Sequence, residues 1–86
     1  MSKTQSNAEL SNMWLEYERP RDGDTYRHYK GGLYTIVATG FLEDTETPCI
    51  VYKSQKLGII WVRTAKNFLE TIEHDGVTVQ RFKLQP

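Results

Sequence analysis

Apolar residues near the start of the chain recur at the spacing of one helical face, i, i+3, i+4 and i+7. These residues are Leu10, Met13, Trp14 and Tyr17. Ser6 and Glu9, three residues apart, match a capping box at a helix N-terminus. The pattern predicts an amphipathic helix over residues 7–18, preceded by a disordered tail over residues 1–6.

The rest of the chain contains runs that alternate with a period of two, which is typical of β-strands. Turn-forming groups such as Gly31-Gly32 separate these runs. The predicted strands are Thr25–Lys30, Leu33–Leu42, Cys49–Ser54, Ile59–Arg63 and Val77–Leu84. The run from Ile59 to Val62 is apolar on both faces, which predicts a central strand or a covered edge. Gly40, inside the longest run, indicates a bulge or a bend.

A short helix is predicted over residues 64–73, between the fourth and fifth strands. Thr64 is a good N-cap residue, and the apolar residues behind it follow helical spacing. They are Ala65, Phe68, Leu69 and Ile72. The next residues, His74-Asp75-Gly76, predict a turn with glycine in a left-handed conformation.

These elements predict a mainly β fold with a small SH3-like, partly open five-stranded antiparallel barrel over residues 25–86. The short helix would precede the last strand, and the N-terminal amphipathic helix would be an addition to the barrel. Residues 19–24 contain Pro20 and Gly23, and we expect them to connect the two parts.

Composition and charge narrow the class of protein. The 86 residues are enough for one domain, and 11 basic residues balance 11 acidic ones. Zero net charge argues against strong nonspecific attraction to nucleic acid or anionic membranes, and it mildly favours self-association. Cys49 is the single cysteine, so no internal disulfide can form and the reducing cytoplasm is expected. We find no pattern of a signal peptide and no apolar run long enough to span a bilayer.

Rings and cations recur on particular strand faces. Alternation places Tyr26, His28 and Lys30 on one side of the first strand, and Trp61 with Arg63 on one side of the fourth. The predicted ligand-binding residues are Tyr26, His28, Lys30, Tyr52, Trp61 and Arg63. Such a patch suits a small anion, a carboxylate or a flat ring. The alternative is that the aromatic residues fill the core while the cations are simply solvated.

The sequence gives little support for catalysis or for a cofactor. Cys49 lies in an apolar strand, where burial would make its thiol inert. The histidines, His28 and His74, have no partner at metal-ligand spacing, and there is no phosphate-binding glycine loop. We therefore expect a non-enzymatic protein that uses no metal and no cofactor.

Partners of other kinds stay open. Basic residues interleave with aromatic ones after Tyr26, as in proteins that bind single-stranded nucleic acid, although acidic residues lie among them. The apolar stripe of the N-terminal helix either docks on its own barrel or forms a homodimer contact. The polar face of that helix is acidic, which argues against a membrane surface. A small ligand or a protein partner is the leading expectation.

Residues 26–84 resemble a family of small bacterial domains of unknown function. The family pattern opens Tyr-x-His-Tyr/Phe-Lys-Gly-x-x-Tyr-x-Val and continues with an acidic turn, a Val-x-Tyr strand, Trp-x-Arg and a Phe-bearing helix. The matching segments are Tyr26-Arg27-His28-Tyr29-Lys30-Gly31, Tyr34, Ile36, Glu43–Pro48, Val51-Tyr52, Trp61-Val62-Arg63 and Phe68. Thr64 stands where the family often has proline. The resemblance implies a fold class, and it assigns no activity.

Overall fold

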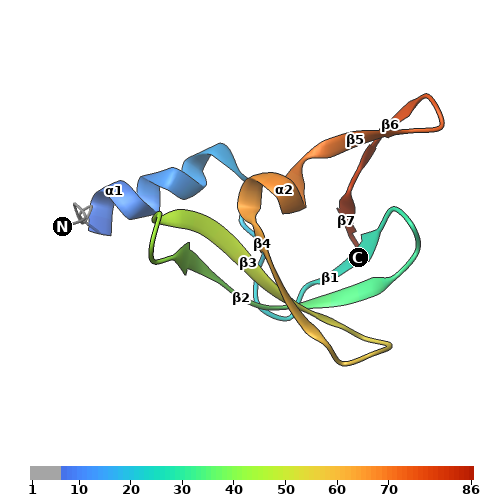
Figure 1. The fold of residues 1–86 in the computed structure, drawn as a ribbon, viewed down its shortest axis with the longest axis horizontal. Helices are drawn as coiled ribbons and strands as arrows, with labels where there is room; N and C mark the ends of the chain where they lie inside the picture. The colour runs from blue at the N-terminus through green and yellow to red at the C-terminus, as the bar shows by residue number, and fades with distance from the viewer. Residues whose placement is uncertain (1–6) are drawn as a thin grey trace.

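The N-terminal segment is helical and is bound to the sheet by the connector that follows it. The computed structural model describes residues 7–86; the predicted tail and the Ser6 capping contact lie outside them. Helix α1 covers Asn7–Asn12 and tightens into the 3-10 turn η1 over Met13–Glu16 (Figure 1). The helical segment ends two residues before the predicted boundary, because Tyr17 is extended and its N–H donates to the Trp14 carbonyl. In the connector, the Gly23 N–H donates to the Ile36 carbonyl at 2.8 Å.

Five antiparallel strands form the main sheet in the order β4-β3-β2-β1-β7. Their bounds are β1 Thr25–His28, β2 Leu33–Leu42, β3 Thr47–Ser54, β4 Ile60–Thr64 and β7 Phe82–Leu84. The predicted mainly β fold is therefore confirmed. The sheet is not a closed barrel, because β4 and β7 each have a single neighbour among the described strands. The SH3-like arrangement stays a prediction.

The region after β4 corrects two predicted elements. Helix α2 covers only Ala65–Leu69, and Thr64 caps it as expected by accepting the Asn67 N–H at 3.2 Å. The predicted helix over residues 64–73 is thus too long. Strand β5, Thr71–His74, pairs instead with β6, Val77–Gln80, in a separate two-stranded sheet. The predicted strand Val77–Leu84 is therefore two strands, β6 and β7, which belong to different sheets.

A tight turn explains this correction. Asp75 and Gly76 have φ angles of 53° and 76°, the left-handed pair that closes a two-residue hairpin. The sequence predicts the turn but gives its first strand to a helix, because Ile72 continues the helical spacing of α2. In the structure Ile72 pairs with Val79 across the hairpin. Figure 1 shows this hairpin and α1 at opposite ends of the molecule.

A bulge in β2 changes which residues face the core. The register with β3 shifts between Ile36 and Ala38, so Val37 is an extra residue that is 43% exposed. The sequence predicts the bulge or bend at Gly40, whereas the register shift lies a few residues earlier. Because the shift reverses the alternation, Ile36 before it and Phe41 after it both contact the core.

The core lies between the inner face of the sheet, α2 and the N-terminal helix. Its buried members are Trp14, Tyr26, Ile36, Ile50, Tyr52, Ala65, Phe68 and Phe82. The rings of Phe68 and Phe82 stack in parallel, with centroids 4.1 Å apart. Within residues 7–86, no helix has the length and apolar character needed to cross a bilayer.

Candidate functional site: an aromatic and cationic mouth

Aromatic rings form an apolar floor at one end of the core. Besides the stacked ring of Phe68, Phe82, which is 3% exposed, contacts one ring from each of three strands. The ring centroids of His28, Tyr52 and Tyr34 lie 4.8, 5.3 and 5.6 Å from its own, all in edge-to-face geometry. β7 therefore supplies a ring that brings together residues from β1, β2 and β3.

Arg63 lies over this floor and is held in place by neutral groups. Its Nε donates to the Tyr52 hydroxyl at 2.8 Å, and its Nη1 donates to Asn67 Oδ1. Its guanidinium carbon is 5.4 Å from the centroid of Phe82. The side chain is half-buried, yet among residues 7–86 Arg63 forms no ion pair. The guanidinium is thus oriented without being neutralised.

His28 also contacts Phe82, and its surroundings favour the neutral imidazole. Its Nδ1 accepts the Lys30 backbone N–H at 3.1 Å, which requires an unprotonated nitrogen. Burial lowers the pKa of His28 below its usual value, and the charges of Arg63, Lys30 and Arg81 lower it further. The tyrosine hydroxyl under Arg63 behaves differently, because burial raises the pKa of Tyr52 although the Arg63 contact opposes that shift.

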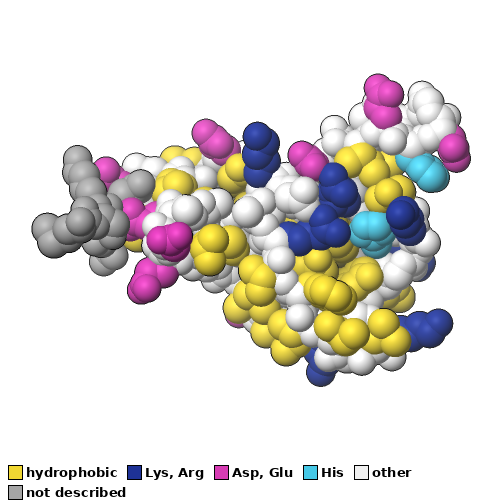
Figure 2. All heavy atoms as spheres, viewed as in Figure 1, with side chains coloured by type: hydrophobic (Ala, Val, Ile, Leu, Met, Phe, Trp, Pro, Cys, Tyr) yellow, Lys and Arg dark blue, Asp and Glu magenta, His cyan; other side chains and the backbone are white. Residues whose placement is uncertain are grey.

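A cavity of about 310 Å³ opens beside Arg63. We call it the arginine cavity; its lining residues are Tyr34, Tyr52, Trp61, Val62 and Arg63. Trp61 is 49% exposed and so forms a wall that a ligand could still cover. Figure 2 shows lysine and arginine side chains gathered around a histidine next to an apolar surface.

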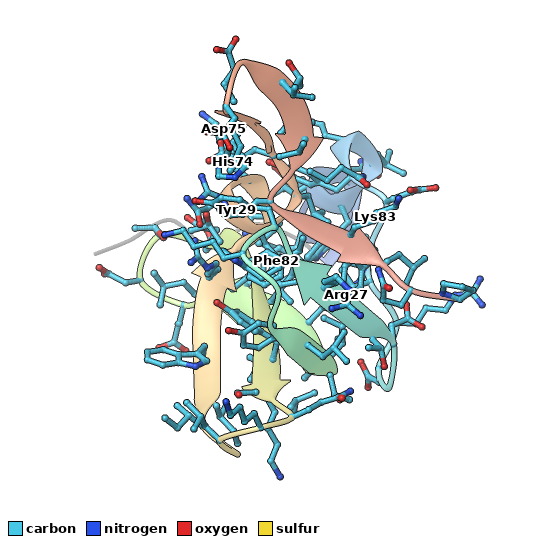
Figure 3. The ribbon with its side chains drawn as sticks, turned by 90° about the vertical axis from the view of Figure 1, so that its right-hand side faces the viewer. Arg27, Tyr29, His74, Asp75, Phe82 and Lys83 are labelled. Atoms are coloured by element: carbon cyan, nitrogen blue, oxygen red, sulfur yellow. The ribbon has the colours of Figure 1, made fainter. Side chains whose placement is uncertain are left out.

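A second cavity, of about 440 Å³, lies between β1 and the β5–β6 hairpin. We call it the hairpin cavity; its lining residues are Arg27, His28, Tyr29, His74, Thr78, Val79, Gln80 and Lys83. In Figure 3, Tyr29 and His74 lie close together, and their ring centroids are 5.2 Å apart. His28 therefore belongs to the hairpin cavity, while its predicted partner Arg63 belongs to the arginine cavity.

The structure brings together only part of the predicted patch. Tyr52, Trp61 and Arg63 line one cavity, and His28 is joined to them through Phe82. Tyr26 is buried against Phe68, with ring centroids 5.2 Å apart, so its ring belongs to the core. Lys30 is exposed in the turn after β1, where its Nζ lies 5.7 Å from the centroid of Tyr29.

Several site residues lie outside the predicted patch. Tyr34, Asn67 and Phe82 position or line the arginine cavity, and Arg27 and Lys83 line the hairpin cavity. Alternation along β2 places Tyr34 on the face of Ile36, but no sequence signal links Phe82 to strands that precede it by about fifty residues. Among residues 7–86, no group of three His, Cys, Asp or Glu side chains could hold a metal ion.

The predicted interface on the N-terminal helix contacts its own chain. Trp14 is 4% exposed, and its ring packs on those of Tyr17 and Phe41 at 6.0 and 6.5 Å between centroids. Arg19 lies over the same indole at 4.7 Å. Leu10 and Met13 are half-buried. Trp14 thus serves intramolecular docking, while a contact made by the rest of the stripe stays a prediction.

Comparisons with known proteins agree with this fold. The sequence pattern of a family described as "Protein of unknown function (DUF1653)" matches residues 24–84, more than half of the chain. The crystal structure of a protein belonging to DUF1653 from Bordetella bronchiseptica is similar, with a TM-score of 0.65 and 26% sequence identity. That likeness covers 77% of this chain and 87% of the other. No curated protein matches the chain. The resemblance predicted from residues 26–84 is confirmed, and the chain belongs to DUF1653, a family of proteins of unknown function.

Proposed function

We propose that this domain is a non-enzymatic binding module whose arginine cavity takes a small ligand that combines a carboxylate with a flat ring. The observation that carries the proposal is the state of Arg63. Its guanidinium is half-buried, fixed by Tyr52 and Asn67, and without an acidic partner among residues 7–86. A carboxylate would supply the missing negative charge in the geometry that a guanidinium prefers.

The walls of the cavity favour the flat ring. Trp61 presents a half-exposed indole, and Tyr34 and Tyr52 add two more aromatic rings. Aromatic walls gain from stacking or edge contacts with a planar ligand. Burial and the neighbouring cations lower the pKa of His28, which favours its neutral form, and Arg63 is the one cation that lines this cavity. The cavity thus offers one cation and several rings.

Binding without catalysis fits the reactive groups of the chain. The thiol of Cys49 is buried. The Nδ1 of His28 already accepts a backbone N–H, and the Nε of Arg63 already donates to the Tyr52 hydroxyl. These groups hold a ligand and offer no activated nucleophile.

The two tryptophans make a direct test possible. Benzoate is added to the ¹⁵N-labelled full chain, and the indole N–H signals are followed by NMR. We expect the signal of Trp61 to shift while that of the buried Trp14 stays in place. Benzamide, which has the same ring without the charge, should bind at least about tenfold more weakly, as expected for loss of a charge-assisted contact.

A matched pair of variants tests the role of the charge. Arg63→Gln removes the cation but keeps an N–H donor for Tyr52, and it should weaken benzoate binding about tenfold or more. Lys53→Gln removes a cation from an exposed position on the opposite face of the sheet and should leave binding unchanged. Equal binding by wild type and Arg63→Gln, with the Trp14 signal confirming both folds, would refute the proposal.

The hairpin cavity supports a second candidate, binding of single-stranded nucleic acid. Tyr29 offers a ring there, and Arg27 and Lys83 offer cations beside it. Bases stack on aromatic rings while cations contact the backbone phosphates. A labelled oligonucleotide is titrated at low and at physiological salt. Binding that weakens steeply with salt and is reduced by Arg27→Gln supports this candidate, and no binding at low salt removes it.

A further inference from the structure

β4 is an edge strand whose side chains are exposed on both faces. It has β3 on one side, and no strand within residues 7–86 lies on the other. Ile60, Trp61 and Val62 are 57%, 49% and 61% exposed. The sequence predicts a central strand or a covered edge here, so the prediction is wrong for the single chain. An apolar strand in this position is a template for pairing with another strand.

The outer side of β4 carries free backbone groups. The Ser54 N–H donates to the Ile59 carbonyl, so the backbone of residue 59 points toward β3. In an antiparallel pair the direction of the backbone N–H and C=O groups alternates along the strand. The backbone groups of Trp61 and Arg63 therefore also point toward β3. The N–H and C=O groups of Ile60 and Val62 consequently point away from the sheet.

The apolar part of this edge lacks three of the devices that commonly protect the edge of a sheet. Natural sheets protect exposed edges with lysine, proline or a bulge. The segment from Ile59 to Val62 contains neither residue, and the register between β3 and β4 runs without a shift from Cys49↔Thr64 to Lys53↔Ile60. The edge is therefore straight enough to pair.

We propose that two copies of this chain pair antiparallel through β4, with Val62 facing Val62 on the two-fold axis. This register uses the outward groups of Val62 for two reciprocal hydrogen bonds and places Ile60 opposite Thr64. It pairs every residue of β4. A register centred on Arg63 would instead place two guanidinium groups opposite each other.

Side-chain chemistry favours the same register. Trp61 and Arg63 lie on the same face of β4, so each Trp61 would stand opposite Arg63 of the second copy. Two symmetric cation–π contacts result, from residues that one chain leaves half exposed. The zero net charge of the chain adds no repulsion between copies.

Pairing also gives the apolar residues of β4 new neighbours. Once paired, β4 lies in the interior of a sheet that continues through both copies, where its outward backbone groups are satisfied and its side chains gain cross-strand contacts. Each Trp61 would then stand next to the arginine cavity of the other copy. The pairing does not depend on the proposed ligand.

The test measures mass by analytical ultracentrifugation from about 1 µM to about 1 mM, a range that detects weak dimers. Wild type should approach twice the monomer mass. Val62→Lys places two like charges on the axis and should weaken the dimer about tenfold or more. Val77→Lys is the matched control, because Val77 is 60% exposed on β6, outside the main sheet. It should leave the dimer intact.

Amide exchange gives an independent measurement. In the single chain the Val62 amide faces solvent, whereas the amides of Trp61 and Arg63 bond to β3. Raising the concentration of wild type should therefore slow amide exchange at Val62. In the Val62→Lys variant, exchange at the neighbouring Ile60 amide should not change with concentration. A monomer throughout the range would overturn the proposal, as would a dimer that Val62→Lys retains and Leu10→Lys abolishes, because that dimer would use α1.

Discussion

The two edges of the main sheet differ in almost every property that governs strand pairing. β7 has three residues, contains Lys83, and is anchored by the buried ring of Phe82. β4 has five residues, and its apolar side chains are exposed on both faces. Both strands are antiparallel to their single neighbour, so the contrast does not come from topology.

The difference shows which side chains hold each edge. Phe82 contacts the rings of Tyr34, Tyr52 and Phe68, so β7 is tied to the core although it is short. On β4, the residues that face inward are Trp61 and Arg63, and both lie at the rim of a cavity. β7 is a protected edge that supports the fold, and β4 is an accessible edge that carries the proposed site and the proposed dimer contact.

Removal of the Phe82 ring that anchors β7 should cause the largest loss of stability. Phe82→Ala removes a ring that is 3% exposed and leaves a cavity between Phe68 and Tyr52. We expect the free energy of unfolding to fall by about 3–5 kcal/mol. Chemical denaturation followed by circular dichroism measures it.

The matched variant on the other edge is Trp61→Ala. Trp61 is the larger side chain, but it is 49% exposed. Its removal should therefore lower the free energy of unfolding clearly less than Phe82→Ala does. Equal losses from the two variants would mean that β4 is anchored as firmly as β7, and the contrast between the edges would fail.

Acid should also lower the free energy of unfolding through the β7 side of the sheet, by less than the loss of Phe82. His28 pairs with Phe82 across β1 and β7, and burial lowers the pKa of its imidazole in the folded state. Above about pH 6.5 the imidazole is neutral in both states, so the full stability is present. As the pH falls below that value, the unfolded chain binds a proton that the folded chain resists, and stability declines until the folded pKa is passed.

Denaturation curves across this pH range measure the effect. His28→Asn should flatten the decline between pH 6.5 and the lower pKa of the folded state. His74→Asn is the control, because the His74 side chain is 52% exposed in the hairpin and lies outside the main sheet. A decline of the same size in wild type and His28→Asn would show that another group is responsible.

Local sequence patterns predict some elements of this fold and not others. Local patterns predict the strands through Arg63 well, because period-two alternation and the Gly31-Gly32 turn are short-range signals. They fail for the segment from Thr71 to Leu84, where Ile72 fits a helix and a strand equally. Only the pairing of Ile72 with Val79 decides between them.

The candidate site was predicted to a similar extent. Alternation places Trp61 and Arg63 on one face, and in the structure both residues line a cavity together with Tyr52. It could not separate Tyr26, which is sealed by Phe68, from residues at the rim. Nor could it find Phe82, since its contacts with β1, β2 and β3 come from long-range pairing that no local pattern contains.

The smallest expected effect concerns the charge on β7 itself. Lys83 stands directly opposite Arg27 in the β1–β7 pair, and like charges at such positions repel. Lys83→Glu turns this pair into an attractive one and should raise the free energy of unfolding by roughly 0.2–1 kcal/mol at low salt. The gain should shrink at high salt, because exposed charges are screened. Lys53→Glu is the control, since its cross-strand neighbours Thr35 and Ile60 carry no charge.

In Lys83→Glu, strand β7 still carries a charge and so remains a protected edge. The sedimentation of this variant should therefore match that of wild type. If Lys83→Glu instead increased self-association, protection of this edge would depend on the sign of the charge, and the contrast with β4 would have to be drawn from Phe82 alone.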